Sequence, residues 1–109
     1  MNNDYIIIGG KRYRVEANWN ALVAYLKMTG KNDMSGLSSF AELAPSDITN
    51  LMLCCIKEGM RLDGIVLDET FTAEYISERI GMSEVSAFLN IYLRQTTPQT
   101  DEEKANPKA

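Results

Sequence analysis

The sequence predicts a mainly α-helical domain of the α+β class, in which an N-terminal β-hairpin is followed by about four short helices. Two short apolar segments near the N-terminus are separated by a Gly-Gly pair, which is a favoured hairpin turn. Later apolar segments are bounded by Asn, Ser, Thr and Gly, the residues that begin and end helices. The chain has 109 residues, enough for one domain. We expect this domain to span residues 1–95, and residues 96–109, which contain no large apolar side chain, to form a disordered, flexible polar tail.

The hairpin is predicted within residues 5–16. Residues 5–8 form a short apolar run, and residues 12–16 alternate around Tyr13 and Val15. Gly9-Gly10 supplies the two-residue turn between them. A lone hairpin is only marginally stable, so we expect it to lie on helices.

The first helix is predicted over residues 19–29, with Asn18 as its N-cap. Apolar side chains at i, i+3, i+4 and i+7 predict its core-facing stripe. The members of this stripe are Trp19, Leu22, Val23 and Leu26. The tripeptide 29–31, Thr-Gly-Lys, resembles part of a phosphate-binding loop, but it follows a helix instead of preceding one. We therefore predict Gly30 as the left-handed residue that ends the helix.

The next helix is predicted over residues 47–60, with Ser46 as its N-cap. It follows a polar connector, residues 31–45, which contains a short helical turn around residues 37–43. Residues 51–56 of the helix read LMLCCI, an apolar run without a break. A helix that is apolar on all sides is either buried on all sides or turns one face towards a partner.

Two further helices are predicted towards the C-terminus. A turn at Asp63-Gly64 leads into residues 65–67, which form either a short strand or an extended segment anchored on the core. A helix then spans residues 72–80, capped by Thr70 or Thr72 and broken by Gly81.

Ser83 is the predicted cap of the last helix, which ends near Gln95. Its apolar stripe consists of Val85, Phe88, Leu89 and Tyr92.

Composition excludes several classes of function. The net charge of −4 disfavours nucleic-acid binding, and the one basic cluster, Lys11, Arg12 and Arg14, is typical of a solvated strand face. Cys54 and Cys55 are expected to be buried and reduced. The chain contains no His to activate a nucleophile, so we predict that it is not an enzyme and takes no cofactor.

Residues 31–42 partly match a calcium-binding loop, but a lysine stands where the first carboxylate belongs, so we predict no metal site. The sequence contains neither a signal peptide nor an apolar run long enough to span a membrane. We therefore expect a cytoplasmic protein.

Protein binding is the remaining class. Met52, Leu53, Ile56 and Met60 are the partner-binding residues that the central apolar helix predicts, because an unpaired apolar helix face can form a groove for a partner helix. The alternative is that all four belong to the core.

The order of these elements resembles one family. The stretches GGKRYRVE, NWNALVAYLKMTGK, SDITNLMLCCIKEGM and FTAEYISERIGMSEVSAFLNIYL follow one another as in the tail assembly chaperones of long-tailed bacteriophages and prophages. The resemblance covers about residues 5–95. It implies a helical, non-enzymatic protein of the host cytoplasm that coats the tape measure protein, keeps it soluble, recruits the tail tube protein and is absent from the virion. It maps no binding residue onto this chain and leaves a homo-oligomer open.

Three alternatives remain. One is a structural or connector protein of the phage particle, and another is a small adaptor module, for instance one that binds nucleic acid through its basic cluster. An enzyme ranks last.

Overall fold

The protein has the predicted α+β fold, a hairpin followed by four helices. A computed structural model describes residues 4–30 and 43–97. Its elements are β1 (Tyr5–Ile8), β2 (Lys11–Arg14), α1 (Trp19–Thr29), α2 (Pro45–Leu62), α3 (Ala73–Ser77) and α4 (Met82–Thr96). The predicted helical turn at 37–43, the calcium-like loop at 31–42 and the polar tail from residue 98 onwards lie outside the described residues.

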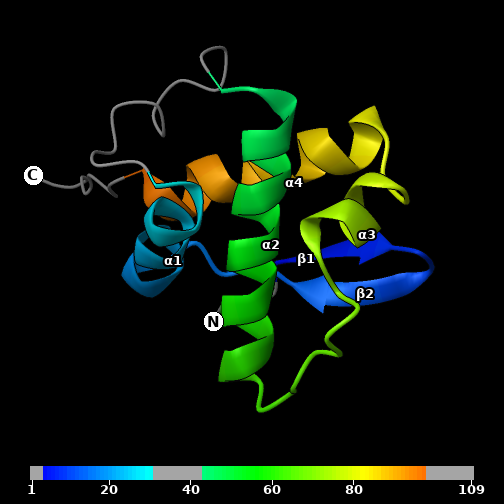
Figure 1. The fold of residues 1–109 in the computed structure, drawn as a ribbon, viewed down its shortest axis with the longest axis horizontal. Helices are drawn as coiled ribbons and strands as arrows, with labels where there is room; N and C mark the ends of the chain where they lie inside the picture. The colour runs from blue at the N-terminus through cyan, green and yellow to red at the C-terminus, as the bar shows by residue number, and fades with distance from the viewer. Residues whose placement is uncertain (1–3, 31–42, 98–109) are drawn as a thin grey trace, which may run out of the picture.

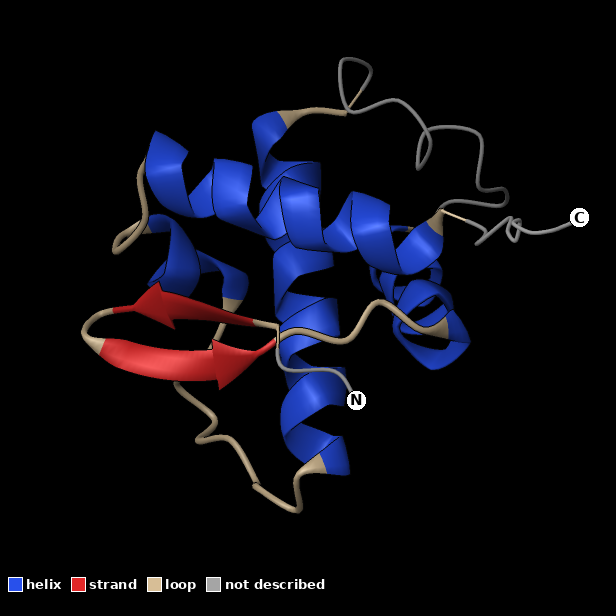
Figure 2. Ribbon diagram, turned by 180° about the vertical axis from the view of Figure 1, so that it is seen from behind, coloured by secondary structure: helices blue, strands red, loops and turns tan. Residues whose placement is uncertain are grey.

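Helix α2 stands at the centre of the fold (Figure 1). Helices α1 and α3 pack on it from two sides, and β2 contacts it as well. Helix α4 crosses α2 on the same side as the hairpin and contacts β1 (Figure 2). The core consequently forms around α2, whose residues 51–56 are all buried.

The hairpin has the predicted alternation. Strands β1 and β2 are antiparallel, and Ile6 pairs with Tyr13 on the face that packs into the core. On the outer face the guanidinium carbon of Arg12 lies 4.4 Å from the centre of the Tyr5 ring. Both turn glycines, 9 and 10, have positive φ, as a two-residue hairpin turn requires.

Helix α1 has the predicted bounds and caps, but its buried face differs from the predicted stripe. The Asn18 side chain accepts a hydrogen bond from the amide of Ala21 at 2.9 Å, and Gly30 ends the helix with a φ of 73°. The side that meets α2 is built on Ala21 and Tyr25, one turn apart. Trp19 lies two residues before Ala21, roughly 200° around the helix, and is 68% exposed. Its assignment to the core was wrong.

The rest of the predicted stripe is only partly in the core. Leu22 is buried, whereas Val23 and Leu26 are half-buried.

Two predicted helix caps were also wrong. Helix α2 begins at Pro45 with Ala44 as its N-cap, because the fixed φ of proline suits the first helical position, so Ser46 lies inside the first turn. Helix α4 begins one residue before Ser83. Its N-cap is Gly81, whose amide donates to the Glu84 carboxylate at 2.7 Å.

The predictions for the C-terminal elements are confirmed in part. The Thr72 hydroxyl caps α3, and the helix is shorter than predicted. Phe88 and Tyr92 of the predicted α4 stripe are buried, while Val85 and Leu89 are half-buried. Residues 65–67 are extended without forming a strand.

The chain crosses α2 directly after β2, and it does so at very short range. The amide of Glu16 donates to the backbone oxygen of Cys55 at 3.0 Å. A Cβ atom at Gly59 would lie 2.4 Å from the backbone oxygen of Arg14, so only glycine fits there. The Gln95 side chain bonds the same crossing segment from α4: it donates to the oxygen of Val15 and accepts from the amide of residue 17. The crossing therefore joins the hairpin, α2 and α4.

A buried carboxylate then joins α1 to α2. The Glu58 side chain is only 4% exposed, and its oxygens accept hydrogen bonds from Arg61 at 2.7 and 3.0 Å. They also accept from the side-chain amides of Asn18 and Asn20, both at 2.8 Å. The Arg61 hydrogen bonds, helped by those from Asn18 and Asn20, lower the pKa of Glu58 to about 2 against the opposing effect of burial. The carboxylate is therefore charged and fully bonded at neutral pH.

We predict that Gly59→Ala lowers the free energy of unfolding by about 1–3 kcal/mol, because the new methyl group meets backbone atoms. Helix propensity alone predicts instead that Gly59→Ala raises the free energy of unfolding by up to about 1 kcal/mol. Urea denaturation followed by circular dichroism decides between them. Asn90→Ala is the control, because it raises helix propensity at an exposed position inside α4. A Gly59→Ala protein at least as stable as the wild type would contradict the close crossing.

We predict that Glu58→Gln lowers the free energy of unfolding by about 1–3 kcal/mol at pH 7, because the charged hydrogen bonds to Arg61 are lost. The folded-state pKa of Glu58 lies below its ordinary value of 4.5, so its contribution is complete above that value and disappears as the pH falls through about 2. The difference between variant and wild type should therefore shrink from pH 4.5 to pH 2 in a series of urea titrations. Glu78→Gln, at an exposed position, is the control. If the difference in free energy of unfolding between Glu58→Gln and the wild type does not vary with pH, this account of Glu58 is wrong.

Candidate protein-binding surface

The four predicted partner-binding residues lie in the core. Met52 and Ile56 are fully buried, Leu53 is 4% exposed and Met60 is 8% exposed. The prediction that they offer a binding face has to be corrected, because α1, α3 and the hairpin already pack around α2. The alternative assignment, to the core, is the one that their burial supports.

The two cysteines are buried as predicted. Burial raises the pKa of the Cys54 thiol to about 11 and raises that of Cys55 further. Both thiols are therefore protonated at neutral pH, a form that is a poor nucleophile.

Exposed apolar side chains gather instead where α2 ends and the chain turns back. Leu62, Ile65 and Val66 lie within five consecutive residues and are 45%, 47% and 94% exposed. The other large exposed apolar residues are more dispersed along the described chain; they are Ile7, Trp19, Met28, Met82 and Leu93.

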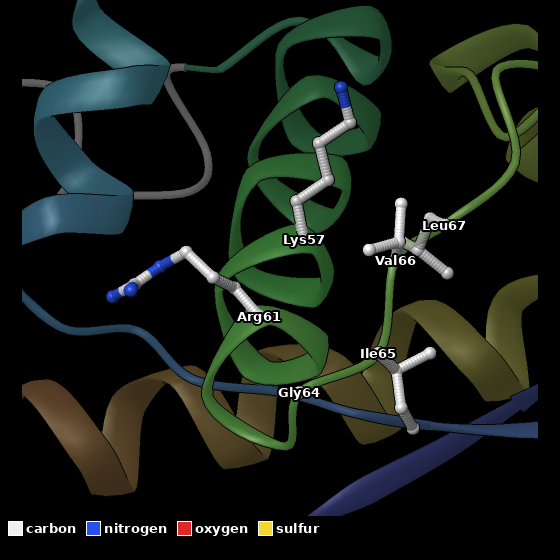
Figure 3. Close-up of a pocket in the computed structure, with 6 residues that line it drawn as sticks. All are labelled: Lys57, Arg61, Gly64, Ile65, Val66 and Leu67. Carbon is white, nitrogen blue, oxygen red and sulfur yellow. The ribbon is translucent and has the colours of Figure 1, made fainter.

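A hollow of about 380 Å³ lies between the exposed side of α2 and the returning segment (Figure 3). Lys57 and Arg61, one helical turn apart, line it from α2, and residues 64–67 line it from the other side. In Figure 3 the Lys57 side chain runs along α2, whereas Arg61 extends away from the returning segment. Val66 stands across from the Lys57 stem.

Two further hollows continue this surface. One, also of about 380 Å³, lies on the other side of residues 65–67 and is lined by Lys11 and Arg12 of β2 and by Phe71 and Tyr75. The other, of about 200 Å³, lies between α1 and α2; its lining includes Met28 and again Lys57 and Arg61. We call the continuous area formed by the three hollows the Val66 surface.

The charges on the Val66 surface are unevenly neutralised. Of its carboxylates, Glu58 is paired with Arg61 and bonded by the two asparagines, whereas Asp68 accepts from the amide of Thr70 at 2.9 Å and keeps its charge. The hydrogen bond from Thr70 lowers the pKa of Asp68. Within residues 4–30 and 43–97, Lys57 and Lys11 form no ion pair. The surface thus presents cations around an apolar centre.

The charge of Arg61 is balanced by Glu58 although its side chain is exposed. The carboxylate of Glu58 raises the pKa of Arg61, and the Arg61 side chain is 62% exposed. Arg14 is likewise held by Asp63 at 2.6 Å and by Glu16 at 3.1 Å. The predicted basic cluster is therefore divided: Arg14 is directed to the crossing, the Arg12 guanidinium lies over the Tyr5 ring, and Lys11 lines the Val66 surface.

Sequence reasoning missed this surface, although one signal for it was present. Lys57 and Arg61 are four residues apart in a helix that is otherwise mostly apolar, and this spacing places them on one side. That side is the part of α2 that the core does not cover. The exposure of Val66 had no comparable signal, because residues 65–67 were expected to anchor onto the core.

Residues 4–30 and 43–97 contain neither a cluster of metal ligands nor a membrane-spanning helix. No group of three or more His, Cys, Asp or Glu residues there is placed to hold a metal ion. None of the helices in these ranges is both long and apolar enough to span a bilayer.

No protein-family model, no curated protein and no solved structure matches this chain. The function proposed below therefore rests on the Val66 surface and on the sequence resemblance.

Proposed function

We propose that this chain is a non-enzymatic protein-binding module that acts as a tail assembly chaperone of a long-tailed phage or prophage. In this proposal it binds the tape measure protein in the host cytoplasm and keeps it soluble until the tail tube protein assembles around it. The observation that carries the protein-binding part is the Val66 surface, where Ile65 and Val66 are exposed together. The resemblance of residues 5–95 supplies the identity of the client.

The physical properties of the surface suit such a role. Apolar side chains that are exposed as a group gain free energy when a partner covers them. A tape measure protein is a long helical rod with apolar stripes, and it would aggregate if these stripes stayed exposed to water. Many copies of a small domain could cover one rod, so self-association of the chain on its client is part of the proposal.

The test is co-expression of this chain with the tape measure protein encoded in the same genome. We expect the tape measure protein to move from the pellet to the soluble fraction and to co-purify with this chain. Co-expression with an unrelated acidic protein of similar size is the control. Mass spectrometry of purified particles should detect no copies of this chain.

A tape measure protein that stays insoluble and does not co-purify would contradict the chaperone. Stoichiometric copies of this chain in the particles would instead support the alternative of a structural or connector protein.

A further inference from the structure

We infer that the Val66 surface binds a helical protein segment whose apolar stripe is flanked by Asp or Glu side chains. The inference deepens the proposed function and rests on it for the identity of the protein that supplies the segment. The surface and the chemistry of its occupant follow from the residues of this chain.

The apolar centre determines the shape of the occupant. Val66 is 94% exposed and stands between two hollows of about 380 Å³, which share residues 65–67 as a common wall. A ridge between two hollows fits a partner that places side chains on both sides of it. Residues three and four apart on a helix are about 5–6 Å apart at Cβ and leave a groove between them, so a helix matches this shape.

The charges determine the chemistry at the edges of the occupant. Lys57 and Arg61 line the first hollow and Lys11 and Arg12 the second, and the two lysines, one in each hollow, have no ion-pair partner among the described residues. Glu58 is neutralised by Arg61, and the other carboxylate that lines the hollows, Asp68, stays charged but is outnumbered by the two lysines. The two lysines therefore attract carboxylates of a partner, although the whole chain has a net charge of −4.

A nucleic acid fits the same surface less well. Of the four cations that line the two hollows, Arg12 lies over the Tyr5 ring and Arg61 is bonded to Glu58, which leaves two lysines without such contacts among the described residues. The side chains exposed between the two hollows are aliphatic, whereas single-stranded nucleic acid is bound by exposed aromatic rings. An acidic amphipathic helix uses both the cations and the aliphatic centre.

The experiment measures binding of labelled peptides to the full chain by fluorescence anisotropy. The first peptide is a designed amphipathic helix with Leu at i, i+3, i+4 and i+7 and Glu at the flanking positions. The second replaces each Glu by Lys, and the third scrambles the first. We expect the Glu peptide to bind at least about tenfold more tightly than either of the others. Raising the salt concentration should weaken its binding, because the lysine charges are exposed to solvent.

Two substitutions, each with a matched control, place the binding on the Val66 surface. Val66→Ser should weaken binding of the Glu peptide about tenfold or more, whereas Met82→Ser, at an exposed apolar position on α4, should not. Lys57→Gln should weaken it about two- to fivefold. Asn90→Glu is its control, because it changes the net charge by the same amount at an exposed position on α4. All four positions are exposed, so thermal unfolding should be nearly unchanged in each variant.

Equal binding of the Glu and Lys peptides, full binding by Val66→Ser, or tighter binding of a DNA or RNA oligonucleotide than of the Glu peptide would each overturn the inference. Co-expression separates it from the proposed function. If the wild type solubilises the tape measure protein and Val66→Ser does so equally well, the inference fails and the proposed function stands. If the peptides and variants behave as expected but the tape measure protein stays insoluble, the inference stands and the proposed function fails.

Discussion

The crossing of residues 14–16 over α2 is the contact on which the rest of the structure depends. It brings a strand end within reach of a helix backbone, and the absence of a side chain at Gly59 makes this approach feasible. The hydrogen bond from Glu16 to Cys55 then sets the direction in which the chain enters α1. Asn18 and Asn20 reach Glu58 from that entry, and Gln95 ties α4 to the same segment. Three helices and the hairpin therefore take their relative positions from one short stretch of backbone.

The polar contacts around the crossing stabilise the fold because the buried Glu58 carboxylate has hydrogen-bond donors for both of its oxygens. A buried carboxylate destabilises a fold unless its oxygens are bonded, and those of Glu58 accept from Arg61 and from both asparagines. The partners come from α1 and α2, so the carboxylate is satisfied only when these helices are in register. Apolar packing alone would tolerate small shifts between the helices. The network around Glu58 thus adds specificity to the packing of Tyr25 and its neighbours against α2.

Local signals in the sequence predicted most of the elements. The doubled glycine, the Asn18 cap and Gly30 act within a few residues, and the structure has the hairpin and α1 where these signals place them. The errors concern long-range choices. The spacing of apolar residues in α1 is compatible with a buried face centred on Trp19 or with one centred on Ala21. The position of α2 determines which of these faces is buried. Likewise the run from residue 51 to 56 is compatible with a core or an interface, because its surroundings come from distant elements. The spacing of Lys57 and Arg61 indicated only the α2 part of the Val66 surface, since the rest forms where β2, α2 and the returning segment meet.

The same helix that organises the core also holds half of the candidate surface in place. The amide of Ile65 donates to the backbone oxygen of Met60 at 2.9 Å, and that of Gly64 to Arg61 at 3.0 Å. These bonds fasten the returning segment to the end of α2, so Val66 is held close to Lys57 before any partner arrives. Prearranged contacts reduce the entropy that the binding protein loses, and most of the ordering cost then falls on the partner. A partner segment that is already helical loses little conformational entropy when it binds. The rigidity of the Val66 surface therefore favours a preformed amphipathic helix over a disordered peptide as its occupant.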